Sequence, residues 1–149
     1  MATTYSFVAG STIKGVKVPI IPTPQEDRLF ILRNIIDFSK QTIDVSESDV
    51  AQVLNIPAGT TVMTVFVRVI TAETAAADFE LGYGGSASLW GTGLGADGTA
   101  GTILGAIQDW VPLYFASADT IDIVGSGAVD LDAFKFEVTA ICLKSMDTY

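Results

Sequence analysis

The sequence predicts an all-β fold, a single jelly-roll-like antiparallel sandwich, and three observations support this prediction. Apolar and polar residues alternate along most of the chain after residue 28, which is the period of a strand with one buried face. Glycine, proline and aspartate separate the alternating runs at short intervals, and no stretch has the period of a helix. The length of 149 residues suits one domain with its own core.

The first strands of the sandwich are expected between residues 30 and 70. Residues 30–38 contain three apolar groups, at 30–32, 35–36 and 38, which predict a strand that is buried more fully than the others. Residues 50–56 are rich in β-branched side chains and are also predicted as a strand. The run 62–70 places Thr64 and Arg68 on one face and four apolar residues on the other: Met63, Val65, Val67 and Val69.

Four later runs, at 77–83, 111–115, 121–123 and 132–144, alternate in the same way. The alternation places Asp122 on a solvent face and Cys142 on the apolar face of its strand, where we expect an inert, buried thiol. Seven or eight strands with this spacing are typical of a sandwich or barrel. Eight residues are expected to contribute most to the core: Phe134, Phe136, Val65, Val67, Leu113, Phe115, Ile121 and Ile123.

Residues 1–28 differ from the rest, because two glycines (Gly10 and Gly15) and three prolines (Pro19, Pro22 and Pro24) interrupt the segment before Arg28. We expect an extended N-terminal arm that lies on a neighbouring subunit, the alternative being a disordered tail. The arm is apolar, it holds Lys14 and Lys17, and it has no acidic residue before Glu26. We therefore expect it to be dispensable for folding, with every strand of the 29–149 sandwich after it, but needed for attachment to an acidic partner surface.

Glycines are also concentrated in 84–106, which the sequence predicts as a long Gly-rich loop. Within it, residues 91–96 match the G-x-G-x-x-A pattern of dinucleotide-binding proteins. That pattern requires a helix directly after the glycines, and residues 97–101 (DGTAG) are a poor helix start. We therefore interpret this stretch as a loop and expect no nucleotide. Residues 99–107 within it are compatible with either a helical turn or a short strand.

Charge and composition exclude several classes of function. Eight basic and seventeen acidic residues give a net charge of −9, which opposes binding to nucleic acids and to anionic membranes. The chain contains no run of 18 apolar residues, so the sequence predicts no membrane-spanning helix. We also expect no signal segment. The absence of histidine removes the usual general base and the commonest metal ligand. With 49% hydrophobic and only 17% charged residues, the chain is expected to bury surface by oligomerising.

Metal and substrate sites have weak support in the sequence. Asp119, Asp122, Asp130 and Asp132 are close together in the chain, but they lack the spacing of a calcium-binding loop. We expect that folding needs no metal and no cofactor. The alternative is that these carboxylates bind calcium. No pair of the seventeen acidic residues stands out as a glycosidase pair.

Large apolar residues in the predicted arm and loop are the candidate interface residues, because such side chains often form the centre of protein interfaces. A sugar-binding platform would use the same aromatic residues, and a third possibility is that they cap the sandwich core. The candidates are Tyr5, Phe7, Val18, Ile20, Ile21, Trp90 and Leu94.

Three segments carry a resemblance to a known group of proteins: residues 36–40, 53–60 and 67–73, which read IDFSK, VLNIPAGT and VRVITAE. In this order they resemble small virion structural proteins of tailed bacteriophages, of the capsid decoration, cement or head-fibre type. The resemblance covers roughly residues 30–84. It implies a single jelly roll that sits as a homotrimer on the capsid exterior and bridges neighbouring major capsid protein subunits. The 84–106 segment and the arm have no counterpart in it.

The resemblance thus implies a non-enzymatic capsid decoration protein with two partners, the major capsid protein and itself. A host-adhesion or carbohydrate-binding module of a phage fibre or tail is the alternative, since it would use the same sandwich with an aromatic face. A hydrolase would need a polar cleft with paired acid and base groups, which the sequence does not indicate.

Overall fold

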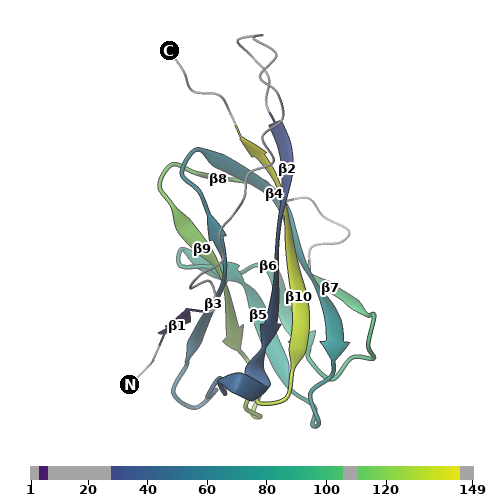
Figure 1. The fold of residues 1–149 in the computed structure, drawn as a ribbon. Coiled ribbons are helices and arrows are strands. Elements are labelled where there is room, and N and C mark those ends of the chain that lie inside the picture. Colours follow the sequence, from purple (N-terminus) through teal and green to yellow (C-terminus); the bar gives the residue numbers. More distant parts are fainter. Residues whose placement is uncertain (1–3, 7–27, 106–110, 145–149) are drawn as a thin grey trace.

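The computed structural model describes residues 4–6, 28–105 and 111–144, and in them the chain is a sandwich of two β-sheets (Figure 1). Strands β1 (Thr4–Ser6), β3 (Val50–Ile56), β5 (Asp78–Tyr83), β6 (Ser86–Gly95) and β9 (Asp119–Gly125) form the β9 sheet, in the order β1-β3-β9-β5-β6. The all-β sandwich predicted from the alternation is confirmed.

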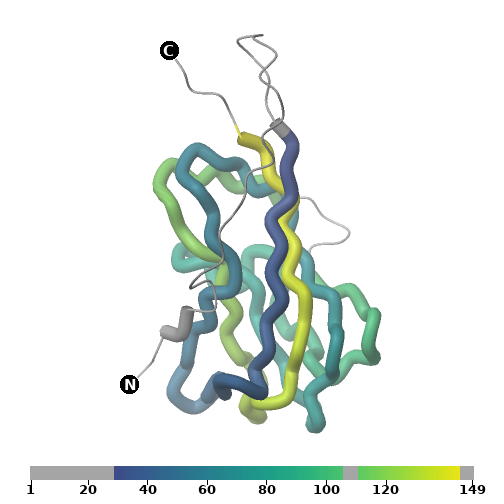
Figure 2. Tube along the Cα trace, viewed as in Figure 1, coloured from purple at the N-terminus to yellow at the C-terminus, as the bar shows by residue number. Residues whose placement is uncertain are grey.

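The second sheet, called here the β10 sheet, has the order β2-β10-β4-β7, with β8 also paired to β4. Its strands are β2 (Arg28–Asp37), β4 (Thr60–Thr71), β7 (Ile103–Gly105), β8 (Leu113–Phe115) and β10 (Lys135–Lys144). The central strand β10 is antiparallel to both β2 and β4, and Figure 2 shows it alongside β2 over the full length of both. Within the described residues, no helix is long and apolar enough to cross a membrane.

The core lies between the two sheets and contains the residues that the period-two pattern predicts. Seven of the eight predicted core residues are buried, and Leu113 is half-buried and packs against the core. Four phenylalanine rings form its centre: Phe38, Phe79, Phe134 and Phe136. The sequence therefore predicted most of the core residues correctly, because alternation alone decides which side of a strand is apolar.

A β-bulge corrects the prediction for β4. The pairing of β4 with β10 changes register between Ile141 and Cys142, so that Thr64 opposes Ile141 whereas Val62 opposes Cys142. Met63 is the extra residue of the bulge. Before it the even-numbered Val62 faces the core, and after it the odd-numbered residues Val65, Val67 and Val69 do. Val62 is consequently buried in the place predicted for Met63, which is half-buried. Thr64 opposes Ile141 and lies with Arg68 on the side of β4 that faces away from the core, as the alternation predicted, although Thr64 is only 5% exposed.

Strand β2 is less buried than its apolar sequence predicted. Leu32 and Ile36 face the core, but Ile31 and Ile35 alternate with them and are 56% and 55% exposed. Phe38, predicted as part of this strand, lies instead in the 3-10 helix η1 (Phe38–Lys40), because Asp37 accepts a hydrogen bond from the Ser39 backbone N–H and ends the strand.

The 84–106 segment is not one long loop. It contains β6, joined to β5 by a two-residue turn at Gly84 and Gly85, and it contains β7. Gly93 has a φ of +58° at a bulge where β6 carries an extra residue relative to β5, a conformation that favours glycine. The glycine content therefore reflects an irregular edge strand, and of the two structures considered for residues 99–107, a short strand is present at Ile103–Gly105.

The N-terminal arm contains one strand of the sandwich, contrary to the prediction that every strand follows residue 28. β1 is parallel to β3, with Thr4 opposite Val50, and forms the edge of the β9 sheet. Arg28 begins β2, where the predicted boundary of the arm lies. Residues 7–27, which hold the predicted interface residues Phe7, Val18, Ile20 and Ile21, lie outside the described part of the chain.

Candidate functional site

The side of the β10 sheet that faces away from the core is the candidate functional surface, called here the outer face. Residues paired across neighbouring strands point to the same side of a sheet, so the register identifies its members. Leu29 pairs with Leu143, and Ile31 with Ile141. The outer face contains Leu29, Ile31, Arg33, Ile35, Asp37, Thr61, Thr64, Phe66, Arg68, Ile103, Tyr114, Lys135, Glu137, Thr139, Ile141 and Leu143.

The outer face collects the exposed apolar residues of the described chain. Five large hydrophobic side chains are exposed there, at 38–68% of their surface: Leu29, Ile31, Ile35, Ile103 and Tyr114. All five belong to the outer face, three of them on the edge strand β2. Single exposed apolar residues are common on proteins, but their concentration on one sheet face indicates a contact surface.

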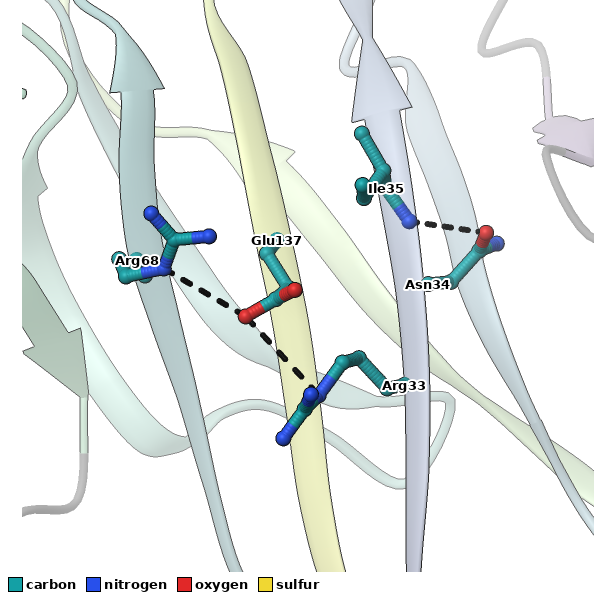
Figure 3. A network of polar contacts seen from close by, with 5 residues as sticks. All are labelled: Arg33, Asn34, Ile35, Arg68 and Glu137. Carbon is teal, nitrogen blue, oxygen red and sulfur yellow. Dashed lines mark hydrogen bonds and ion pairs between the residues drawn. The ribbon is translucent and has the colours of Figure 1, made fainter. Parts of the chain in front are cut away.

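A small polar network lies within the outer face, drawn in Figure 3. Glu137 on β10 lies between two arginines, with its Oε1 3.5 Å from Arg68 Nε on β4 and 3.9 Å from Arg33 Nε on β2. Both arginine side chains are about half exposed, Arg33 at 57% and Arg68 at 44%, whereas Glu137 is 16% exposed. Exposed pairs of this kind contribute little to stability. They leave positively charged groups accessible among apolar neighbours.

The free edge of β2 is partly closed by Asn34. Its Nδ2 donates to the Val53 carbonyl across the sandwich, at 3.1 Å, and its Oδ1 accepts from the Ile35 backbone N–H at 2.9 Å. In Figure 3 this N–H points away from β10. A backbone donor on the open edge of the sheet is therefore satisfied within the chain at this position, which limits pairing with a foreign strand there.

Charge is divided unequally between the two sheets. The strands of the β10 sheet contain five basic and two acidic residues. The strands of the β9 sheet contain four acidic residues and no basic one: Asp78, Glu80, Asp119 and Asp122. The chain as a whole has a net charge of −9. The β10 sheet is thus a positively charged layer in an acidic protein.

Two of the sequence-predicted interface residues have described side chains, and the structure separates them from the outer face. Trp90 is only 2% exposed, and its Nε1 donates to the Val111 carbonyl at 3.2 Å. It packs near Tyr83 with ring centroids 6.1 Å apart. The alternative that Trp90 caps the core is the one that the structure supports. Leu94 is half-buried and packs against the core, and Tyr5 lies in β1.

The residues of the outer face were not singled out by the sequence, although one signal for them exists. Arg33 has the same parity along β2 as Leu29, Ile31 and Ile35, and a charged side chain in an apolar run marks the side that faces solvent. The adjacent apolar residues of the run, at 29–32 and 35–36, obscured this alternation.

The remaining sequence motifs are structural. Cys142 is buried, and this burial raises the pKa of its thiol to about 12, as expected for an inert cysteine. Gly91 to Gly95 of the dinucleotide-like motif lie within strand β6. Of the late aspartates, Asp130 accepts from the Val45 backbone N–H at 2.9 Å and Asp119 from the Thr120 N–H at 2.8 Å. No group of three or more possible metal ligands occurs among residues 4–6, 28–105 and 111–144.

Asp122 corrects a further prediction, since it was expected to face solvent. It is 8% exposed on the non-core side of β9, between Gln52 of β3 and Gly82 of β5, and its Oδ1 accepts from Thr120 Oγ1 at 2.7 Å. Burial raises its pKa to about 6, and the negative charge of Asp119 acts in the same direction, whereas the hydrogen bond from Thr120 opposes it.

Replacing Asp122 with Asn should therefore stabilise the protein at neutral pH. A carboxyl whose pKa is higher in the folded state than its ordinary 3.8 favours folding only while protonated, so its ionisation lowers stability as the pH rises from about 4 to 6. We expect Asp122→Asn to raise the free energy of unfolding by about 1–3 kcal/mol at pH 7.5 and by little at pH 4. Urea denaturation at both pH values measures this. The exposed Asp119→Asn is the matched control, and an equal gain from it would contradict the prediction.

Comparisons with known proteins support the fold. No protein-family model and no curated protein sequence matches the chain. Solved structures match it: a chain of the cyanophage Pam1 capsid asymmetric unit has a TM-score of 0.56 at 16% identity, covering 90% of this chain and 97% of that one. A chain of the acidic stable capsid of Helicobacter pylori bacteriophage KHP30 gives 0.54 at 11% identity, covering 83% and 94%. A chain of the capsid of Ralstonia phage GP4 gives 0.58 at 8% identity, covering 95% and 98%.

Proposed function

We propose that this chain is a non-enzymatic capsid decoration, or cement, protein of a tailed bacteriophage that binds the exterior of the major capsid shell and stabilises it as a homotrimer. The observation that carries the proposal is the fold match to chains of three phage capsids. The match covers 83–95% of this chain and 94–98% of those chains. Since nearly all of both chains is covered, the likeness is to entire capsid chains of similar length and not to a shared module.

The outer face supports an adhesive role. A protein that holds neighbouring shell subunits together needs a stiff scaffold and a contact surface, and it needs no acid or base. The sandwich provides the scaffold, and the outer face provides an apolar surface with arginines on a rigid sheet. The low charged fraction of 17% favours a trimer, because further surface is available for burial between copies.

The N-terminal arm is proposed as a second attachment element. Its apolar side chains and its two lysines, with no acidic residue before Glu26, suit an acidic neighbouring surface. The strand β1 does not conflict with this role, because it accounts for only three residues of the arm.

The adhesion alternative receives no support from Trp90. A carbohydrate-binding platform needs exposed aromatic side chains, and Trp90 is buried. Tyr114 is the exposed large aromatic residue among the side chains that the structure describes, and a stacking platform generally uses more than one ring.

The proposal is tested by adding the purified protein to shells of its own phage that lack it, and by counting bound copies per particle. We expect saturable binding of hundreds of copies, because the partner surface repeats over the whole shell, and a higher melting temperature of the decorated shell. Particles from infected cells provide the same count independently. A few to some tens of copies would indicate a fibre or tail component and would contradict the decoration role.

A further inference from the structure

We propose that the outer face of the β10 sheet lies against the shell, and that the shell surface which it contacts is apolar and acidic. This inference rests on the proposed function, and it deepens that function by naming the attachment surface, the orientation of the molecule and the chemistry of its partner.

The apolar part of the argument comes from the strand register. Leu29 and Ile31 of β2 oppose Leu143 and Ile141 of β10, so apolar side chains continue from one strand to the next without interruption. Tyr114 of β8 pairs with Thr61, which in turn opposes Leu143, and extends the same row. Because the backbone of a paired sheet is rigid, these side chains meet a partner with little further loss of conformational entropy.

The charges on the two sheets indicate that the partner surface is negatively charged. The arginines on both sides of Glu137 make the outer face locally positive, while the opposite sheet contributes four acidic residues and no basic one. In a chain of net charge −9, this division orients the molecule: an acidic surface attracts the β10 sheet and repels the β9 sheet.

The same division argues against a second copy of this chain as the occupant. A two-fold contact between two outer faces would place one positive layer against another, which is unfavourable. A contact between the outer face of one copy and the acidic β9 sheet of the next would use opposite sides of the sandwich. Such a head-to-tail contact propagates as an open stack, and it does not close into the proposed trimer.

The edge of β2 also points to the face as the site of contact. Strand addition requires free backbone groups along the edge, and Asn34 occupies the Ile35 N–H and ties β2 to Val53. The side chains of Ile31 and Ile35 on the outer face are about half exposed and can contact a partner.

Two substitutions of opposite charge at one position test whether the outer face is the contact surface and whether the partner surface is acidic. In the full chain, Ile31→Glu and Ile31→Lys are compared with Ser88→Glu and Ser88→Lys, which change an exposed residue of β6 on the other sheet. Dissociation constants for shells that lack the protein are measured for each variant. Light scattering gives the oligomer mass, and circular dichroism with a thermal scan confirms that each variant is folded.

We expect Ile31→Glu to weaken shell binding by at least about tenfold, because it removes apolar contact and adds repulsion. Ile31→Lys should weaken binding less, the Ser88 variants should bind as the wild type does, and all four should keep the wild-type mass. Equal losses for Glu and Lys would overturn the acidic character of the partner. A loss of oligomer mass in Ile31→Glu would make this face a contact between copies.

Wild-type binding together with unchanged binding of Ile31→Glu would overturn this inference and leave the decoration role intact. If the wild-type protein itself did not bind the shells, the proposed function and the inference would both fail. The two failures are therefore distinguishable from one data set.

Discussion

Truncation of Phe136 to Ala should destabilise the protein by about 3–5 kcal/mol. Phe136 lies on β10 and is fully buried. Its ring stacks on Phe134 with centroids 4.7 Å apart, and it meets Phe38 edge-on at 5.3 Å. Phe134 in turn lies 5.4 Å from Phe79 of β5, so the cluster connects the two sheets. An alanine here would leave a cavity among rings that are fixed by both layers of the sandwich.

Urea denaturation of the wild type and the Phe136→Ala variant gives this difference. Tyr114→Ala is the matched control, since it removes an aromatic ring that is 52% exposed and should cost less than about 1 kcal/mol. If the two variants lost the same stability, the four phenylalanines would not form the centre of the core.

Loss of the Glu73 carboxylate should have an effect of similar size, about 3–5 kcal/mol for Glu73→Ala. Glu73 follows β4 and is 5% exposed. Its Oε2 accepts from three consecutive backbone N–H groups, those of Asp132, Ala133 and Phe134, at 2.9–3.1 Å. Its Oε1 accepts from the Thr74 N–H at 2.9 Å. Removing the carboxylate leaves these donors without an acceptor, the Phe134 N–H in a buried position.

The conservative variant and the pH dependence separate this role from simple packing. Glu73→Gln keeps the shape and one acceptor oxygen, so it should cost clearly less than Glu73→Ala in the same denaturation experiment. Burial works against ionisation of Glu73, but the hydrogen bonds from the backbone N–H groups of Ala133, Thr74 and Asp132 outweigh it and lower the pKa of Glu73.

A lowered pKa in the folded state stabilises folding above the ordinary value of 4.5, and this contribution is lost as the pH falls below it. The destabilisation by Glu73→Gln should therefore shrink between pH 7 and pH 3. The hydrogen bond to Glu73 and the charge of Glu73 raise the pKa of Asp132, so this neighbour protonates first on acidification. An unchanged difference between Gln and Glu at pH 3 would contradict the charged role.

Local alternation predicted most of the strands after residue 28 and most of the core. The strand predicted at 50–56 is β3 with the same bounds, and 77–83, 121–123 and 132–144 each contain a strand close to the predicted position. The buried positions of these strands follow from the sequence because each side chain's direction depends only on its place in a period-two repeat. The same alternation predicted an inert, buried Cys142.

The functional surface, in contrast, depended on contacts between distant parts of the chain. Trp90 was attributed to a loop, but β5 pairs with its segment and places the indole in the core. The sequence did not indicate a role for Glu73, because its carboxylate accepts hydrogen bonds from residues 132–134, about sixty positions later in the chain. Contacts of this kind join distant parts of the chain, and neither residue propensity nor the period of the sequence predicts them.

The sequence by itself thus determined an acidic, histidine-free β-sandwich with alternating apolar strands. Only the tertiary structure decided that Leu29, Ile31 and Ile35 lie at a sheet edge with solvent on one side, and that Arg33 and Arg68, 35 positions apart in the numbering, meet at Glu137. An apolar run has the same composition whether one or both of its faces are covered. Which face is left open depends on the layer that packs against it, and that layer comes from elsewhere in the chain.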